Sequence, residues 1–570
     1  MRLLRIFIFS LGVLFISCQN ESSLESIIEN YEEFTDSQRD EEFPWPKTTS
    51  NEIEKQLKFY KEIEVSLASV NKETLSDKDL INFEMLEHIV KDRVYNLSFQ
   101  SYLIPITSEG GFVTGIIYSL QNRRIKNEED LIRYLKRLRS LPQYIDQRIE
   151  NMRSGLESNI KSSKFITSKF LDILDPFIKN QVNAGEIFRN TLESYSGELS
   201  EEIEQELNTL ISKDIPESLA KLSDFMHNEY YTEAYDKIGA GQLPKGDQYY
   251  EQRVEYFTTL EISPEEVFQT GMKEVARIRA DMEEIIEELE FEGTWEDFFE
   301  FLRTDPQFYA KTPAQLLMRA SWICKEMEYE MPKYFSKMPR MPFSVKPVPE
   351  AIAPNYTAGR YSGGSYDDHR AGQYWVNTTK LTSRPLYALP ALSLHEAVPG
   401  HHTQNMLAAE MKDLPQFRRT YLSAFGEGWG LYSEYLGIEA GIYKTPYEHF
   451  GRMTYEMWRA CRLVVDVGMH YKGWDRQKAF DFMASNTALS IHEVNTEIDR
   501  YIGWPAQAVS YKIGELKIRE LRERAEEKLG DSFDIRSFHD KVLENGSVPL
   551  STLERIMDQY ISEQLNSRDG

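Results

Sequence analysis

The chain has 570 residues, and 41% of them are hydrophobic, which is enough for a large core and excludes general disorder. Its 66 Lys and Arg against 92 Asp and Glu give a formal net charge of −26, with no lysine or arginine block beyond the first seventeen residues. Nucleic acid is therefore not an expected partner, and the acidic composition alone identifies no substrate.

The N-terminus has the pattern of a bacterial export signal. Two arginines precede an apolar run at residues 6–16, which is too short to span a membrane. Cys18 follows, as in lipoprotein signals whose cysteine is lipidated, although the residues before it are bulkier than usual. We expect a signal peptide at 1–17, a lipidated Cys18 with a short tether at 18–23, and a lipid-anchored protein of the bacterial cell envelope, at the periplasmic or outer-membrane face. Secretion to the periplasm without an anchor is the alternative.

Helical spacing dominates most of the remaining chain. Apolar residues recur three and four positions apart, which predicts helices. The predicted helices span residues 53–70, 79–98, 128–156, 161–192, 200–231, 247–261, 263–290, 294–303, 312–331 and, further on, 458–474. Ser263 and Pro264 open one of them with a cap and a fixed first turn. The fold class is therefore mainly α.

No Gly/Ser-rich or Pro-rich linker and no repeat interrupts the chain after the tether. We therefore expect one helical unit at 24–570, with an N-terminal lobe at about 24–260 and a second lobe at about 261–570. The N-terminal helices either form one wall of a cleft or serve only as an accessory lobe. Cys324 and Cys461, the cysteines of this unit, are expected to be buried free thiols.

The composition changes at residues 338–379, which are rich in Pro, Gly, Tyr and β-forming residues. Residues 373–378 predict a short strand, which could be the edge along which an extended peptide binds. The glycine-rich segment 356–365 is either a flap over a cleft or a structural loop. It lacks a GxxxxGK pattern, so nucleotide binding is not expected.

The densest group of metal-binding side chains is HEAVPGHH at residues 395–402, after a mostly apolar run at 386–394 that predicts a buried helix. Two neutral imidazoles can hold Zn²⁺, and the carboxylate next to the first histidine can serve as general base. The alternative is a packed histidine that happens to precede a helix-ending Pro-Gly pair. Three histidines and a glutamate within eight residues favour the metal site.

The spacing differs from the H-E-x-x-H signature, in which two histidines share one helix face. On a straight helix, at about 100° per residue, His395 nearly eclipses His402 and points away from His401. Pro399 and Gly400 exclude a straight helix, because proline cannot donate a hydrogen bond and glycine permits an unusual backbone. We expect a kink that turns one of the two later histidines toward the metal, and the residues alone leave both open.

A third ligand is expected from FGEGWGLYSE at residues 425–434. Glu427 and Glu434 lie about two helical turns apart on one face, so either could complete the site. The glycines beside Glu427 would let two helices approach closely. We predict Glu427 as the ligand and Glu434 as the group that orients a ligand histidine.

Four stretches, HEAVPGHHTQ, FGEGWGLYSE, WRACRLVVDVGMHYKGW and RYIGWPAQAVSYKIG, resemble the bacterial domain of unknown function 885 family. That family is regarded as zinc peptidases of the gluzincin type, similar in layout to the carboxypeptidase Taq and thimet oligopeptidase groups. The resemblance implies a large two-lobed helical zincin-like fold with a deep central cleft and a small β-sheet near the site. It also implies one zinc ion held by His395, His401 and Glu427, with Glu396 as general base.

Two groups of polar residues follow the metal motifs. Asp466 and His470 are four residues apart on a predicted helix, so they are either an active-site pair or an interior polar pair. We predict His470 as a second group in catalysis, Tyr511 as hydrogen-bond donor to the oxyanion, and Arg500 with Tyr501 for binding a substrate carboxylate. The related helical metallopeptidases use tyrosine and basic residues from this region in such roles.

Together these features predict an enzyme that hydrolyses peptide bonds of oligopeptides with metal-activated water, as an oligopeptidase or a carboxypeptidase. Two other functions remain open. A zinc hydrolase of a non-peptide amide or ester would use the same ligands, and a non-catalytic binding lipoprotein of the cell envelope would keep the fold without turnover. The intact His395, Glu396, His401 and Glu427 argue against the last of these.

Overall fold

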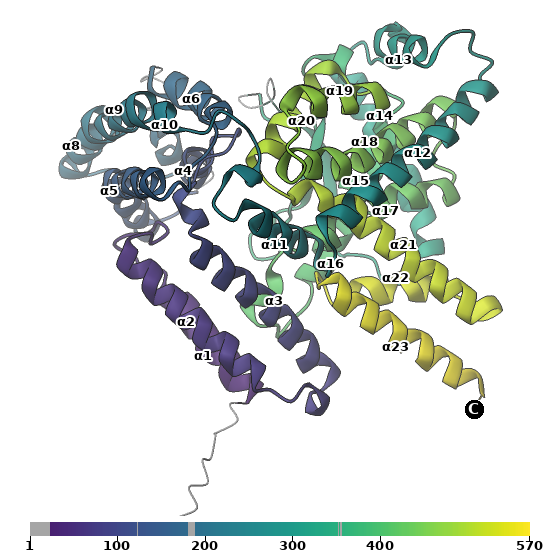
Figure 1. Ribbon diagram of the computed structural model, residues 1–570, viewed down its shortest axis with the longest axis horizontal. Helices are drawn as coiled ribbons and strands as arrows, with labels where there is room; N and C mark the ends of the chain where they lie inside the picture. The colour runs from purple at the N-terminus through teal and green to yellow at the C-terminus, as the bar shows by residue number, and fades with distance from the viewer. Residues whose placement is uncertain (1–22, 122–123, 180–187, 351–352, 354–355, 570) are drawn as a thin grey trace, which may run out of the picture.

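Helices form most of the computed structural model, which describes residues 23–121, 124–179, 188–350, 353 and 356–569 (Figure 1). The expected signal peptide and Cys18 lie outside the described residues. The helices of the first half are α1 Leu24–Ser37, α2 Ser50–Ala68, α3 Asp77–Phe99, α4 Phe112–Gln121, α5 Glu128–Ser158, α6 Lys164–Lys179, α8 Glu201–Thr209, α9 Ile215–Phe225, α10 Tyr231–Glu233 and α11 Gly246–Thr258. The mainly helical fold class is thereby confirmed.

The second half contains the helices that surround the candidate site. They are α12 Pro264–Glu288, α13 Trp295–Thr304, α14 Pro313–Tyr334, α15 Leu389–Glu396, α16 His401–Ala409, α17 Ser423–Glu439, α18 Pro446–His470, α19 Arg476–Asn486, α20 Ile491–Gly503, α21 Ser510–Leu529, α22 Ile535–Leu543 and α23 Leu550–Asp569. Ser263 caps α12 as predicted, because its side chain accepts from the Glu266 N–H while the Glu266 carboxylate accepts from the Ser263 N–H.

Three predicted helices differ from the observed ones. The helix predicted at 161–192 is observed as α6, which ends at Lys179, and residues 180–187 lie outside the described residues. The segment predicted as one helix at 200–231 contains π-helical turns at Leu210–Asp214 and Met226–Tyr230. Helix α18 begins at Pro446 behind the Thr445 cap, well before the predicted start at 458. Buried charged residues in its first half hide the apolar spacing that the sequence prediction relied on.

A small sheet adjoins the helices in the second half. Its strands are β1 Phe343–Pro347, β2 Gly359–Ser362 and β3 Gly372–Val376, in the order β1-β3-β2, with β1 parallel and β2 antiparallel to β3. The strand predicted at 373–378 is thus the central strand, and the prediction that it forms the edge is wrong. The edge strands are β1 and β2, and β2 comes from the glycine-rich segment that was expected to be a flap or loop.

The helices around the site pack closely. In α17, a Cβ on Gly428 would lie 2.5 Å from the backbone of Gly514 in α21, so glycine is needed at this crossing. Helix α12 lies along α18, where a Cβ on Gly271 would meet the Leu463 side chain at 2.7 Å. A single buried hydrophobic cluster includes residues from Leu24 to Ile561, so both halves of the chain share a core. Cys324 and Cys461 are buried free thiols, as expected.

Candidate metal centre

The metal-binding motif folds as two short helices with a break between them. Helix α15 ends at Glu396 and α16 begins at His401, with a cis peptide bond before Pro399. A Cβ on Gly400 would lie 1.9 Å from the His395 carbonyl oxygen, so only glycine fits this position. The indole N–H of Trp429 in α17 donates to the Pro399 carbonyl at 2.9 Å. The backbone between Glu396 and His401 therefore has a defined geometry, which could not be predicted from the sequence.

This break brings together His395, His401 and Glu427. The Nε2 atoms of both histidines lie 3.4 Å from the Glu427 Oε2, and donor atoms of the three residues all lie within 4.8 Å of one another. In a tetrahedral zinc site with bonds of about 2.1 Å, neighbouring donors are about 3.4 Å apart. Two imidazoles and one carboxylate are also the ligand types that zinc accepts, so the donor set fits this metal.

The surroundings favour positive charge at this point. Burial lowers the pKa of His395, but hydrogen bonds with Glu427 and Glu434 outweigh that effect and raise the pKa to about 10. Burial likewise raises the pKa of Glu427, but His401 and His395 hold it well below its usual range. The carboxylates therefore provide the negative charge that a bound cation requires.

A carboxylate on the next turns of α17 orients the first histidine. The Glu434 Oε1 lies 2.8 Å from the His395 Nδ1, which leaves Nε2 directed at the centre. Arg459 of α18 lies 3.4 Å from the same oxygen. Behind the ring, a Cβ on Gly430 would approach the His395 ring to 2.6 Å, so this glycine makes room for the imidazole. Glu434 thus occupies the orienting position that the sequence predicted for it.

His402 has a different environment from His401. Its Nδ1 lies 3.1 Å from the Tyr361 hydroxyl and its Nε2 lies 3.0 Å from the Met341 carbonyl oxygen, so both ring nitrogens have partners. Burial lowers its pKa to about 4, which keeps the ring neutral. The structure therefore places His401, rather than His402, with the other two candidate ligands.

Glu396 lies between the candidate ligands and the edge strand. Its Oε2 accepts a hydrogen bond of 2.7 Å from the Tyr361 N–H of β2. The Tyr361 N–H points away from the sheet, and its hydrogen bond fixes the position of the Glu396 Oε2. Glu396 is 8% exposed and borders the same cavity as His395, His401 and Glu427.

The candidate ligands line a cavity of about 750 Å³, which is within the usual size range of ligand pockets. The N-terminal half contributes Glu109, Tyr256 and Phe257 to its wall. The other lining residues that carry polar groups include Arg360, Tyr361, Tyr421, Arg459, Arg462, Glu493, Glu497, Arg500, Gln507 and Tyr511. The cavity thus combines the metal candidates with hydrogen-bond donors from both halves.

Two of the predicted C-terminal residues reach this cavity. Tyr511 lines it, with the Arg462 guanidinium 4.2 Å from its ring centroid. Arg500 also lines it, although it donates to Gln507 at 2.6 Å and to Glu497 at 3.3 Å. Both residues therefore remain candidates for contact with a substrate.

The other two predicted residues, His470 and Tyr501, do not line the cavity that contains the candidate ligands. His470 is buried, with Nδ1 accepting from the Ala240 N–H at 2.9 Å and Nε2 lying 3.0 Å from the Tyr501 carbonyl oxygen. The Tyr501 hydroxyl bonds to Trp458, Arg462 and Glu497 in the core. The structure therefore gives both residues interior packing roles, and the expectation that they contact substrate is not supported by their positions.

Sequence reasoning missed several lining residues. Arg459 and Arg462 are buried cations in an otherwise apolar stretch of α18, and charge within such a stretch is a signal that could have found them. Tyr421 packs over Gly426, where a Cβ would lie 2.3 Å from its ring, and it lines the cavity beside Glu427. No spacing rule singles out this tyrosine.

Among the described residues, no helix combines the length and apolar character needed to cross a bilayer. No curated protein matches the chain. A crystal structure from Colwellia psychrerythraea, of a protein described as a putative lipoprotein, is similar with a TM-score of 0.86 and 26% identity, over 96% of this chain and 99% of the other.

A second similar structure, from Shewanella oneidensis, is described as a putative lipoprotein of unknown function. It has a TM-score of 0.72 and 19% identity, over 94% of this chain and 96% of the other, and at this identity it supports the fold alone. The family described as "Bacterial protein of unknown function (DUF885)" matches residues 36–557, in agreement with the four motifs. The match covers most of the chain, and the chain therefore belongs to this bacterial family.

Proposed function

We propose that this protein is a zinc-dependent peptidase that hydrolyses peptide bonds of oligopeptides. The observation that supports this most strongly is the convergence of His395, His401 and Glu427 in the wall of a large cavity, beside a fourth residue, Glu396, that can act as a base. Zinc held by these three residues supplies Lewis-acid chemistry, because it makes bound water more acidic and polarises a carbonyl group.

The chain's own residues then move protons and hold charge. Glu396 takes a proton from the attacking water and returns it to the leaving amine, with its Oε2 held by the Tyr361 N–H. Tyr511 donates to the oxygen that becomes negative during attack. Arg500 at the cavity wall provides positive charge for a substrate carboxylate.

The edge strand supports a peptide as the substrate. Residues of β2, including Gly359, Arg360 and Tyr361, line the cavity. An extended chain could lie beside this edge as in other cases of strand addition, although the Tyr361 N–H already donates to Glu396 and the Gly359 carbonyl accepts from Thr357. We propose that the two helical halves are the lobes of a zincin-like fold, with the cavity between them as the substrate cleft.

We further propose that Cys18 carries a lipid anchor at the cell envelope. The similarity to the Colwellia psychrerythraea structure, which is described as a putative lipoprotein, supports this location. Secretion to the periplasm without lipid remains the alternative, and mass spectrometry of the mature N-terminus distinguishes the two.

The decisive experiment measures bound zinc and peptide cleavage on the same purified samples. About one zinc per chain is expected for the wild-type protein, with loss of both zinc and cleavage in Glu427→Ala. Glu396→Gln should keep the zinc but lose roughly 100-fold to 10,000-fold in cleavage rate. The control is Glu439→Gln, which lies on the same helix as Glu427 but outside the cavity. It should bind zinc and cleave peptides as the wild type does.

A wild-type protein that binds no transition metal when zinc is supplied would contradict the proposal. Zinc binding without cleavage of any member of a peptide library would instead indicate a hydrolase for another amide or ester. Unchanged cleavage in Glu396→Gln would exclude this residue as the base.

A further inference from the structure

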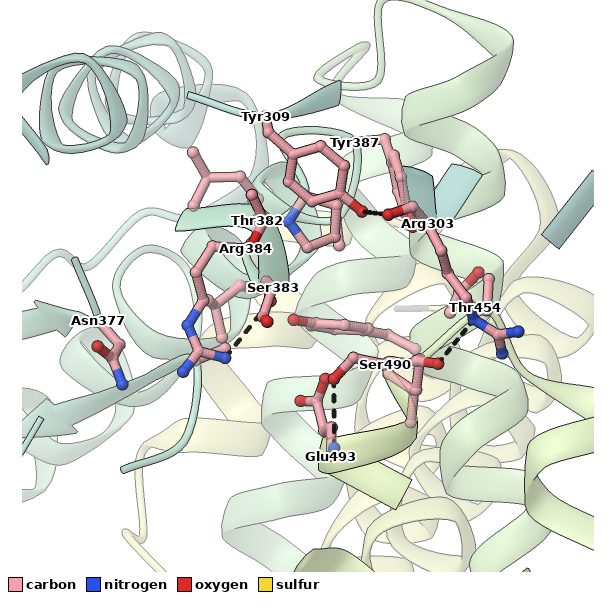
Figure 2. A pocket seen from close by; sticks show the side chains of 18 of the residues that line it. Arg303, Tyr309, Asn377, Thr382, Ser383, Arg384, Tyr387, Thr454, Ser490 and Glu493 are labelled. Atoms are coloured by element: carbon pink, nitrogen blue, oxygen red, sulfur yellow. Dashed lines mark hydrogen bonds between the residues drawn. The ribbon is translucent and has the colours of Figure 1, made fainter. Parts of the chain in front are cut away.

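Figure 2 shows a second, smaller cavity, which shares lining residues with the cavity of the candidate metal site. It has a volume of about 230 Å³, which is below the usual range for a whole small-molecule ligand and suits one side chain or end group. Ala358, Leu392, Tyr455 and Glu493 border both cavities. Leu392 lies three residues before His395 on α15, a rise of about 4.5 Å. A group in the pocket is therefore within reach of a peptide bound at the metal site.

The pocket contains a buried cation without a carboxylate partner. Arg384 is only 9% exposed, and its Nε has no hydrogen-bond partner. Its other two nitrogens make long contacts of 3.4 Å and 3.3 Å to the carbonyl oxygens of Ser383 and Tyr356. Among the described residues, no carboxylate lies within ion-pair distance of Arg384. A guanidinium in this state has unused capacity to bind an anion.

Other groups in the pocket add to this capacity. Arg303 enters from the opposite side in Figure 2 and donates only to the backbone carbonyls of Leu489 and Thr487. The Thr454 hydroxyl is buried, and its oxygen also lacks a partner. Arg384, Arg303 and Thr454 thus all line one small space, and two of them carry a buried donor without a partner, which costs free energy in the empty pocket.

One carboxyl group, Glu493, lies at the boundary of the two cavities. Burial raises its pKa to about 7 against the opposing effect of Arg384, so the group is partly neutral near neutral pH. A protonated Glu493 would be a further donor, and an ionised one would leave the two guanidinium groups in excess. The pocket therefore favours an anion over a cation in either state.

We propose that this Arg384 pocket binds a carboxylate of the substrate, from an acidic side chain or from the chain terminus, next to the bond that is cleaved. This inference rests on the proposed peptidase function for its place in catalysis. The pocket itself can be tested without catalysis, because binding of a small carboxylate needs only the folded protein.

The test uses ligand-observed NMR titration of three probes into the zinc-loaded full chain. N-acetylglutamate α-amide carries only a side-chain carboxylate, N-acetylglutamine carries only a terminal carboxylate, and N-acetylglutamine α-amide carries neither. At least one carboxylate probe should bind roughly 10-fold or more tightly than the amide, and which one it is distinguishes the two sources. Arg384→Met should abolish this preference, and Arg384→Lys should restore part of it.

Thr454→Val is the second variant, because it removes a buried hydroxyl and nearly preserves shape. It should weaken binding of the preferred carboxylate probe roughly 10-fold and leave the affinity for the neutral probe unchanged. If Arg384→Met does not fold, Arg384→Lys and Thr454→Val still test whether the pocket binds the carboxylate. Carboxylate binding that is equal in the wild-type protein and in both of these variants would indicate binding elsewhere, such as at the zinc, and would overturn the proposal.

The two proposals fail in different ways. Arg384-dependent carboxylate binding in a protein that cleaves no peptide would support the pocket and contradict the peptidase. Peptide cleavage with no preference between acidic and amide probes would support the peptidase and overturn the pocket.

Discussion

At the scale of single residues, the orientation of His395 depends on Glu434. The carboxylate fixes Nδ1, so Nε2 faces His401 and Glu427. Glu434 is also almost fully buried and lies near Arg459, which limits its movement. A histidine that is oriented and made more basic in this way binds a metal more strongly than an unsupported one.

Glu434→Gln tests this relationship. The amide can keep the shape and one hydrogen bond but removes the negative charge, so zinc affinity should fall roughly 10-fold to 100-fold. Competition with a chelating dye measures the affinity. The control is Glu439→Gln, which lies on the same helix and pairs with Arg522 outside the site. Equal affinity in the wild-type protein and Glu434→Gln would show that the carboxylate does not tune the site.

The sequence predicted the positions of Glu427 and Glu434 within one helix better than it predicted which histidine follows the break between α15 and α16 into the site. Glu427 and Glu434 share one regular helix, so their separation follows from the helical period. The choice between His401 and His402 depended on the backbone between Glu396 and His401, and a straight helix would have favoured His402. Family resemblance, rather than spacing, pointed to His401.

At the scale of elements, predictions failed where the interior contains charge. The core positions of α18 include Arg452, Glu456, Arg459 and Arg462, which conventional patterning assigns to a surface. His470, on the same helix, was expected at the active site because it lies four residues after Asp466, yet backbone groups satisfy both of its nitrogens. Which buried polar side chain faces a cavity is decided by tertiary packing, and one sequence does not contain that information.

The buried charges join three helices of the second half. Lys512 of α21 is fully buried and lies 2.9 Å from Glu456 of α18, 3.2 Å from Glu274 of α12 and 2.8 Å from Glu515. Arg277 and Arg452 also contact Glu456. Loss of one partner would leave the others charged in a poorly solvated interior.

Lys512→Met is therefore expected to lower the free energy of unfolding by about 3–5 kcal/mol, although the new side chain is apolar and of similar length. Urea unfolding followed by circular dichroism measures the change. Lys528→Met, at an exposed position of the same helix, should change the stability by less than about 0.5 kcal/mol. Similar urea midpoints for Lys512→Met and Lys528→Met would mean that the buried ion pairs of Lys512 do not stabilise the folded protein.

At the scale of the whole molecule, the shared core connects local protonation to global stability. His539 is fully buried, with Nδ1 2.9 Å from the Tyr334 carbonyl oxygen and Nε2 2.7 Å from the Tyr432 hydroxyl. Burial lowers its pKa to about 3, and burial lowers the pKa of His88 to about 4. Protonation of either ring would place a charge in a poorly solvated position, so both stay neutral while the protein is folded.

These shifts predict loss of stability in mild acid. An unfolded histidine gains a proton near pH 6.5, whereas folded His539 gains one only near pH 3, so the unfolded state binds more protons between these values. Stability should therefore fall as the pH falls through this window. The lowered pKa of Glu456 adds a second loss, which begins only below about pH 4.5.

His539→Gln separates this histidine from the other groups that titrate. Glu493, with its pKa raised to about 7, acts in the opposite direction between pH 7 and 4.5, so the wild-type slope alone does not report on His539. The variant should reduce the slope of unfolding free energy against pH, between 6.5 and 4.5, by up to about 1.4 kcal/mol per pH unit. The exposed His369→Gln control should keep the wild-type slope. Equal slopes in all three proteins would mean that the His539 ring is already protonated in the folded protein, which would require a different hydrogen-bond arrangement with Tyr334 and Tyr432.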